Sequence, residues 1–271
     1  MICWICKKTP ANSAEHKFKS SQLKRMHGRS FLEKITIGNE FKEQLLQGPK
    51  SEKVKFPKVI CEECNNDKTS SHDRAFDRLI NWTNKNYKEL EKMKTIDFRL
   101  VYGENWVDEK MNLLKYMAKH AGCKIVTGQI QNDVNKLSKL IYNDVKTTSF
   151  HIGFIVKEAF NYLDLIIKSK GSDGLKFISN SGTVCRKTSK NEIVYFAGMT
   201  TYNWFSIIWV FTQNNHKTVF DGFDNQIEDV FFLPFSELPE KNKNQDWFDF
   251  IDKQNIELIP NQVSIYDEFI K

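Results

Sequence analysis

The stretch CEECNNDKTSSHDRAF, residues 61–76, joins a Cys-x-x-Cys pair to two asparagines and then to a His-Asp pair. A Cys-x-x-Cys pair presents both sulfurs from one tight turn, which suits half of a tetrahedral Zn²⁺ site. A second pair stands near the N-terminus. We therefore expect one structural zinc ion, held by Cys3, Cys6, Cys61 and Cys64. The alternative is that one pair or both are free core thiols.

The other two cysteines and the N-terminus bear on the environment of the protein and of its cysteines. Cys123 and Cys185 have no partner at ligand spacing and are expected in the core. The first residues, MICWICKKTP, lack a secretory signal, and no apolar run is long enough to span a membrane. We expect a cytoplasmic protein without membrane contact, and in a reducing cytoplasm paired cysteines favour metal over disulfides.

Composition and charge narrow the class of protein. The 271 residues are 40% hydrophobic and 13% aromatic, enough to bury a core in one large or two small domains. Residues 1–95 hold 20 Lys and Arg against 12 Asp and Glu, whereas the remainder holds 20 against 22. This concentrated positive charge favours a polyanionic partner, although a solvated lysine-rich surface would have the same composition.

A change of composition near Lys92–Ile96 predicts two domains, residues 1–95 and 96–271. In the first we expect helices around 20–26 and 38–47, a short strand in 54–60, and a helix after Cys64. Phe76, Leu79 and Ile80 show the i, i+3, i+4 spacing of that last helix, which Trp82, Tyr87 and Leu90 would extend.

The second region predicts an α+β domain with a mostly antiparallel sheet. FRLVYG, residues 98–103, has the composition of a strand, and 107–123 has the pattern of an amphipathic helix capped by Gly122. Another helix is expected near 133–142. Runs rich in Phe, Ile, Val and Trp predict strands at 149–156, 192–199, 203–213 and 229–235. The tail from Trp247 onward has no clear pattern.

Between the two cysteine pairs lies SAEHKFKSS, residues 13–21, in which Glu15 directly precedes His16. The order Cys-x-x-Cys, Glu-His, Cys-x-x-Cys-Asn resembles the HNH endonuclease family, in its zinc-bound form with Glu-His in place of Asp-His. The resemblance covers roughly residues 1–80. It implies a ββα-metal fold related to treble-clef zinc domains, and a metal-dependent endonuclease acting on DNA.

The resemblance also implies roles for particular residues. By position, His16 matches the general base that takes a proton from the attacking water, and Glu15 matches the acidic ligand of the catalytic metal. Asn65 matches the third motif position, which contacts the same ion. The middle asparagine of the family, which holds the loop by backbone hydrogen bonds, has two candidates, Asn39 and Asn66, and that role stays open.

Phosphodiester hydrolysis is consistent with these residue types. It needs an activated water and a cation that neutralises charge developing in the transition state. An imidazole titrating near neutral pH suits the base, and Mg²⁺ or Mn²⁺ prefers oxygen ligands such as those of Glu15 and Asn65. The Cys₄ zinc would be closed and take no part in the chemistry.

The role of His72 depends on where its helix begins. In an unbroken helix from Asn65, His72 would lie roughly 10 Å along the axis, too far to share an ion. A helix starting at Ser70 or Ser71 would let the preceding loop fold back, and His72 could then reach the metal. A contact with DNA and a plain surface position are the alternatives. Asp73 suits the first turn of that helix or an ion pair.

The expected DNA contacts are basic side chains near these elements, and such phosphate contacts are independent of base sequence and sensitive to salt. They are Lys17, Lys19, Lys24, Arg25, Arg29, Lys68 and Arg74. The other histidines, at 27, 120, 151 and 216, show no ligand spacing. His120 is expected to compensate the dipole at a helix C-terminus, and His151 to lie in the core.

Three functions are consistent with the sequence. The first is a DNA endonuclease, with RNA as a further substrate. The second is a treble-clef zinc module that binds nucleic acid without catalysis. The third is a prokaryotic restriction or phage-defence effector whose nuclease stays inactive until the second domain senses a signal or a regulatory protein partner; this is an analogy at the level of domain arrangement. A homodimer would supply two sites for cutting both strands.

Overall fold

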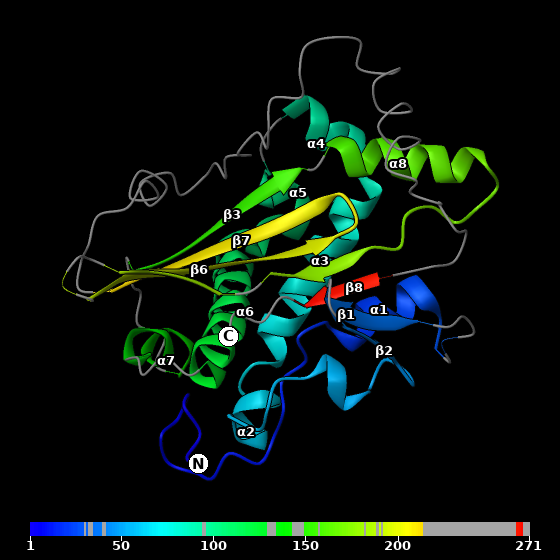
Figure 1. Cartoon of the computed structure of the whole chain (residues 1–271). Helices are drawn as coiled ribbons and strands as arrows, with labels where there is room; N and C mark the ends of the chain where they lie inside the picture. Colours follow the sequence, from blue (N-terminus) through cyan, green and yellow to red (C-terminus); the bar gives the residue numbers. More distant parts are fainter. Residues whose placement is uncertain are drawn as a thin grey trace.

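The computed structural model combines helices with an eight-stranded sheet (Figure 1). It describes residues 1–29, 31, 35–39, 42–93, 96–128, 134–142, 149–156, 158–181, 183–187, 190, 192–213 and 264–267. The α+β class expected from the sequence is confirmed. The strand predicted at 229–235, the residues from Trp247 to Gln262 and His216 lie outside the described residues.

The regular structure of the first region is mostly helical. Its elements are α1 (Ser20–His27), β1 (Thr36–Asn39), β2 (Lys42–Leu45), the short helix η1 (Glu52–Val54), α2 (Glu62–Asn65), α3 (Ser70–Lys85) and α4 (Tyr87–Met93). The helix expected around 38–47 is wrong, because β1 pairs with β2 as a hairpin and also with a distant strand. Strand pairing supplied by the tertiary fold outweighs the helical pattern of this short segment.

The rest of the chain supplies the long helix and most of the sheet. Its helices are α5 (Phe98–Tyr102), η2 (Gly103–Asn105), α6 (Trp106–Thr127), α7 (Asn135–Tyr142) and α8 (Glu158–Ser169). Its strands are β3 (Phe150–Val156), β4 (Ile178–Asn180), β5 (Val184–Lys187), β6 (Ile193–Tyr202), β7 (Phe205–Thr212) and β8 (Ser264–Asp267). The helix near 133–142 and the strands expected at 149–156, 192–199 and 203–213 are therefore confirmed.

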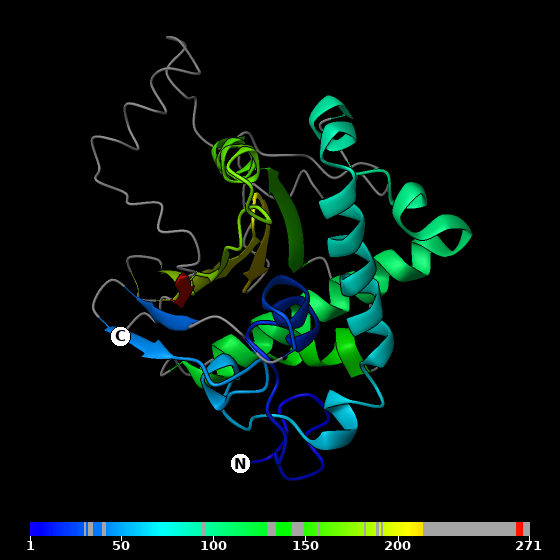
Figure 2. The same ribbon diagram turned by 90° about the vertical axis from the view of Figure 1, so that its right-hand side faces the viewer.

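The sheet has the order β2-β1-β8-β4-β6-β7-β3, with β5 paired to β6. All pairs are antiparallel except β1 with β8 and β4 with β8, so the expected mostly antiparallel sheet is confirmed. Figure 2 shows α3 and α6 crossing one another on one side of this sheet. The β1–β2 hairpin joins the same sheet through β8.

Two predictions in the second region are wrong for local reasons. The predicted strand at 98–103 is helical: residues 98–102 form α5 and Gly103 begins η2. The carboxylate of Asp97 accepts the backbone N–H of Arg99 at 2.9 Å and caps α5. Gly122 does not end α6, which continues to Thr127. A β-carbon at Gly122 would lie 2.1 Å from the indole of Trp4, so this glycine permits close packing rather than termination.

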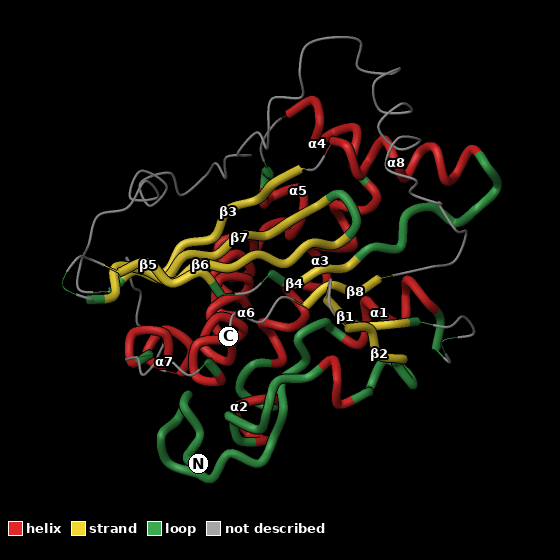
Figure 3. The backbone as a smooth tube through the Cα atoms, viewed as in Figure 1, coloured by secondary structure: helices red, strands yellow, loops and turns green. Residues whose placement is uncertain are grey.

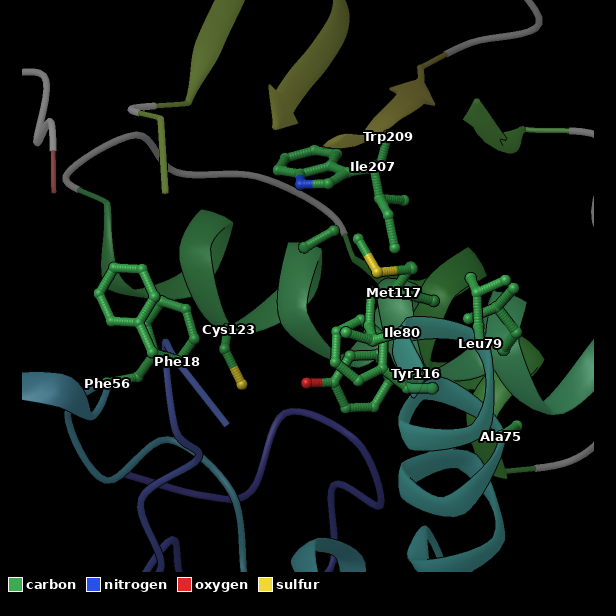
Figure 4. Packing of buried hydrophobic residues seen from close by; sticks show 14 of the residues in the cluster. Phe18, Phe56, Ala75, Leu79, Ile80, Tyr116, Met117, Cys123, Ile207 and Trp209 are labelled. Carbon is green, nitrogen blue, oxygen red and sulfur yellow. The ribbon is translucent and has the colours of Figure 1, made fainter. Parts of the chain in front are cut away.

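One hydrophobic cluster crosses the expected domain boundary. Figure 4 shows residues of the first region, among them Phe18 and Phe56, gathered with residues of α6, α3 and β7. Cys123 in α6 is fully buried as expected, whereas Cys185 is only partly buried. The division into residues 1–95 and 96–271 stays a prediction.

Candidate metal centre and active site

The four cysteines of the two Cys-x-x-Cys pairs lie close together. The segments that carry them, the N-terminal loop and the chain around α2, are neighbours at one end of the molecule (Figure 3). The four sulfurs all lie within 4.8 Å of one another. The Sγ atoms of Cys6 and Cys61 are 3.9 Å apart. Tetrahedral Zn²⁺ with bonds of about 2.3 Å separates its sulfurs by about 3.8 Å, so the four thiols fit one zinc ion.

Within the part of the chain that the structure describes, no other group of three or more Cys, His, Asp or Glu side chains could share a metal ion. Cys3, Cys61 and Cys64 are buried, and Cys6 is half-buried. Burial opposes ionisation of Cys6, but the hydroxyl of Thr9 and nearby backbone N–H groups outweigh it and lower the pKa of this thiol to about 6.

The segment carrying Glu15 and His16 runs antiparallel to residues 54–60. Ser13 N–H donates to Ile60 O at 2.9 Å, and His16 forms an isolated bridge with Lys55. The strand expected at 54–60 is therefore irregular; Val54 ends the short helix η1. The chain then enters α2 and α3, so two bridged segments without regular strand structure are followed by helices.

Asn65 joins this segment to the second cysteine pair. Its side-chain amide Nδ2 donates to Ser13 Oγ at 2.9 Å and to Ala14 O at 3.3 Å. Holding the loop in this way is the role left open between Asn39 and Asn66. Of those two, Asn39 lies in β1 and Asn66 directly follows α2.

The carboxylate of Glu15 is paired with a lysine from α6. Lys119 Nζ lies 2.6 Å from Glu15 Oε2, and the Lys119 side chain is 0% exposed. The same ammonium lies 3.1 Å from Thr69 Oγ1 and 3.4 Å from Asp73 Oδ1. Three oxygens from three segments of the first region thus surround one buried cation of the second.

The second oxygen of Glu15 is also engaged. Glu15 Oε1 accepts the backbone N–H of His16 at 2.9 Å and lies 3.8 Å from His120 Nε2. Burial opposes ionisation of Glu15, but Lys119 and His120 outweigh it and hold the pKa of this carboxyl well below its usual range. Burial also disfavours the Lys119 cation, yet Glu15 and Asp73 outweigh it and raise the lysine pKa.

Two imidazoles lie beside Glu15, and burial disfavours the protonated form of each. Burial lowers the pKa of both His16 and His120, against the opposing influence of Glu15. The Nε2 atom of His16 is buried without a hydrogen-bond partner. His120 packs between the rings of Phe56 and Tyr116, at 5.9 and 4.6 Å between centroids. The expected role of His120 at a helix end is wrong, because α6 continues beyond it.

These contacts do not fit the expected site for Mg²⁺ or Mn²⁺. Oε2 of Glu15 already pairs with the Lys119 ammonium, and Oε1 accepts the N–H of His16. The hydrogen bonds of Asn65 to Ser13 and Ala14 use its Nδ2, not the Oδ1 that would bind a metal. Glu15 and His16 lie together as expected, but the carboxylate of Glu15 is already engaged by Lys119 and by the N–H of His16. Asn65 as a metal ligand stays a prediction.

The helix that carries His72 begins at Ser70, the later of the two starts considered, and not at Asn65. Asp73 occupies the first turn of this helix, α3, and pairs with Lys19 and Lys119, as expected. His72 is buried, so the surface interpretation is wrong. Burial, with Lys115 and Lys119 nearby, lowers the pKa of His72 to about 3.

The basic residues expected to contact DNA divide into two groups. Lys17 is buried, and Lys19 is half-buried in ion pairs that include Asp77 at 2.9 Å. The others are exposed: Lys24, Arg25, Arg29, Lys68 and Arg74. Among the remaining histidines, His151 is buried in β3 as expected, and both ring nitrogens of His27 are buried without hydrogen-bond partners.

Sequence reasoning missed Lys119 and His120 as members of this cluster. The available signal was weak: Lys115 and Lys119 are four residues apart within an otherwise apolar helical run, and both are buried. Such a pair indicates a buried counter-charge but does not say which carboxylate supplies it.

Comparison of the chain with protein-family models, with curated proteins and with solved structures finds no match. None of the described helices is both long and apolar enough to cross a membrane.

Proposed function

We propose that this chain is a zinc-stapled hydrolase of nucleic-acid phosphodiester bonds, of the HNH type. The observation that carries the proposal is the pair of antiparallel bridged segments around Glu15 and His16, followed by α2 and α3 and tied by Asn65 to a four-cysteine cluster. The arrangement agrees with the ββα-metal unit that the sequence resemblance implies.

His16 suits the general base in this proposal. A base must be neutral to accept a proton from water, and burial lowers the pKa of His16 so that the neutral form dominates at pH 7. Its Nε2 atom makes no hydrogen bond within the protein and is left to take that proton. Glu15 holds the backbone of His16 through the 2.9 Å contact with its N–H.

The proposed partner is DNA, with RNA as a further substrate. Exposed cations on and beside α1 and α3 would meet the phosphates: Lys24, Arg25, Arg29 and Arg74. Such contacts predict binding that weakens steeply with salt.

A nuclease assay with zinc-loaded protein tests the proposal. DNA and RNA substrates are incubated with Mg²⁺, with Mn²⁺ and with a chelator too weak to remove the zinc. His16→Asn should slow cleavage by roughly 100-fold or more, the usual contribution of a general base. His27→Asn is the matched control, because it also removes an imidazole of the first region whose Nε2 is buried without a hydrogen-bond partner, and it should leave the cleavage rate unchanged.

Equal cleavage by His16→Asn and the wild type would contradict the assignment of the base.

One observation favours a second function, a zinc module that binds nucleic acid without cutting it. The Lys119 ammonium already pairs with the carboxylate of Glu15, which would otherwise bind the catalytic metal. Salt-sensitive binding without cleavage under all conditions would identify that module. Control of a nuclease by the second region, as in a defence effector, stays a proposal.

A further inference from the structure

The pairing of Glu15 with Lys119 crosses from the first region to α6 and has no counterpart in the sequence motif. Lys119 has no exposed surface, and its ammonium lies 2.6 Å from Glu15 and 3.4 Å from Asp73. A buried cation persists only when nearby negative charge and hydrogen-bond acceptors replace its lost hydration. Two carboxylates and the hydroxyl of Thr69 supply that replacement.

We propose that Lys119 is the resident cation of the Glu15 site, in the place where a divalent metal ion would otherwise bind. This inference rests on the proposed function for its catalytic meaning, but not for its chemistry. The ammonium is a fixed positive charge that holds Glu15 ionised and oriented toward the N–H of His16. Lys119 is a positioning residue, because it is fully buried and touches no substrate.

Geometry argues against Lys119 and a divalent ion occupying the site together. An ion with oxygen ligands at roughly 2.1 Å would need an oxygen of Glu15 that Lys119 or the N–H of His16 now uses. Adding two positive charges beside a fully buried ammonium is also opposed by strong repulsion at low dielectric. The site therefore takes either Lys119 or the ion.

The inference has a consequence for the organisation of the chain. Lys119 and His120 belong to α6, beyond the expected boundary at residue 95. The second region thus completes the electrostatics of the Glu15 site.

Binding of Mn²⁺ to the zinc-loaded protein, followed by electron paramagnetic resonance, tests the inference without any cleavage assay. The wild type and Glu15→Gln should bind the same small amount of Mn²⁺, because Glu15 is already occupied. Lys119→Met should gain one Mn²⁺ per chain, and adding Glu15→Gln to that variant should abolish the gain. Lys119→Arg keeps the charge and should bind no more Mn²⁺ than the wild type.

Binding of Mn²⁺ to the wild type that Glu15→Gln removes would overturn the inference. So would a folded Lys119→Met protein that gains no ion. Should Lys119→Met fail to fold, the comparison of the wild type with Glu15→Gln still decides the question of occupancy. Thermal melting then tests the pairing, since Lys119→Met should be rescued in part by Glu15→Gln; equal melting of the single and double variants would contradict it. Absence of nuclease activity would remove the proposed function but leave these results standing.

Discussion

Gly122 is needed because it has no β-carbon. It lies within α6, where the ring of Trp4 packs so closely that a β-carbon would stand 2.1 Å from the indole. Glycine in a helix interior costs about 1 kcal/mol relative to alanine. The close approach of the N-terminal loop to the helix outweighs that cost.

We therefore expect Gly122→Ala to destabilise the protein, against the usual helix preference. Overpacking a filled site costs about 1–3 kcal/mol, more than the roughly 1 kcal/mol gained in helix propensity. Denaturant unfolding would measure the free energy change. In a Trp4→Ala background the same substitution should be neutral or stabilising, and an identical effect in both backgrounds would contradict the packing explanation.

Residue identity also has limits as a guide to role. His120 and Lys119 look like helix-end residues because Gly122 follows them, and a glycine after a basic pair is typical of a C-terminal cap. The contact that explains Gly122 is made by Trp4, which is more than a hundred residues earlier in the sequence. Only the packed structure therefore shows that Gly122 is not a helix cap.

Among the elements, the β6–β7 hairpin depends on one turn residue. Tyr202 pairs with Phe205, which leaves Asn203 and Trp204 as a two-residue loop. Asn203 has φ of +54°, a region open mainly to Gly, Asn and Asp. Its N–H donates to Phe177 O at 2.7 Å, and its Oδ1 accepts the N–H of Phe177 at 2.9 Å.

The stability of variants at Asn203 should therefore depend on two properties: whether the new residue tolerates a positive φ, and whether its side chain can accept the N–H of Phe177. Asn203→Asp keeps both properties and should change the unfolding free energy least. Asn203→Gly keeps only the backbone freedom and should lose about 1 kcal/mol with the hydrogen bond. Asn203→Val loses both and should be the least stable, by roughly 2 kcal/mol or more. Thermal melts of the three proteins would check the order, and a valine variant as stable as the aspartate variant would refute it.

The elements also show which sequence patterns were sufficient. Helix α3, helix α7 and strands β3, β6 and β7 follow periodicities that span several residues, and each was predicted. The 38–47 segment and α5 were predicted wrongly because each is short. A four-residue strand or a five-residue helix has too few positions for its period to be distinctive, so strand pairing or a capping carboxylate decides its structure.

At the scale of the whole molecule, the loop that carries the first cysteine pair also contacts the helices α6 and α7. The hydroxyl of Ser138 in α7 donates to Ile5 O at 2.6 Å, and Trp4 packs on α6. Residues inside the first cysteine pair are thus in contact with α6 and α7 of the second region. Loss of the metal would remove this support from the core.

We expect one zinc ion per chain, measured by elemental analysis of protein purified under reducing conditions. Cys64→Ser should lose nearly all of the zinc and lower the melting temperature by many degrees, because metal binding at such sites is coupled to folding. Cys185→Ser is the control, since Cys185 lies outside the cluster, and it should keep both. A fully stable wild-type protein without zinc would contradict the four-thiolate site.

The sequence by itself determined the grouping of the four cysteines, the adjacency of Glu15 and His16, and the main helices and strands. These features rest on spacing and periodicity within short windows. The tertiary structure alone decided that Glu15 faces Lys119, that Asn65 holds the loop before Glu15, and that His72 is buried. The reason is physical: a buried charge is neutralised by whichever opposite charge the packing of the core brings to it, and that choice depends on how α6 lies across α3.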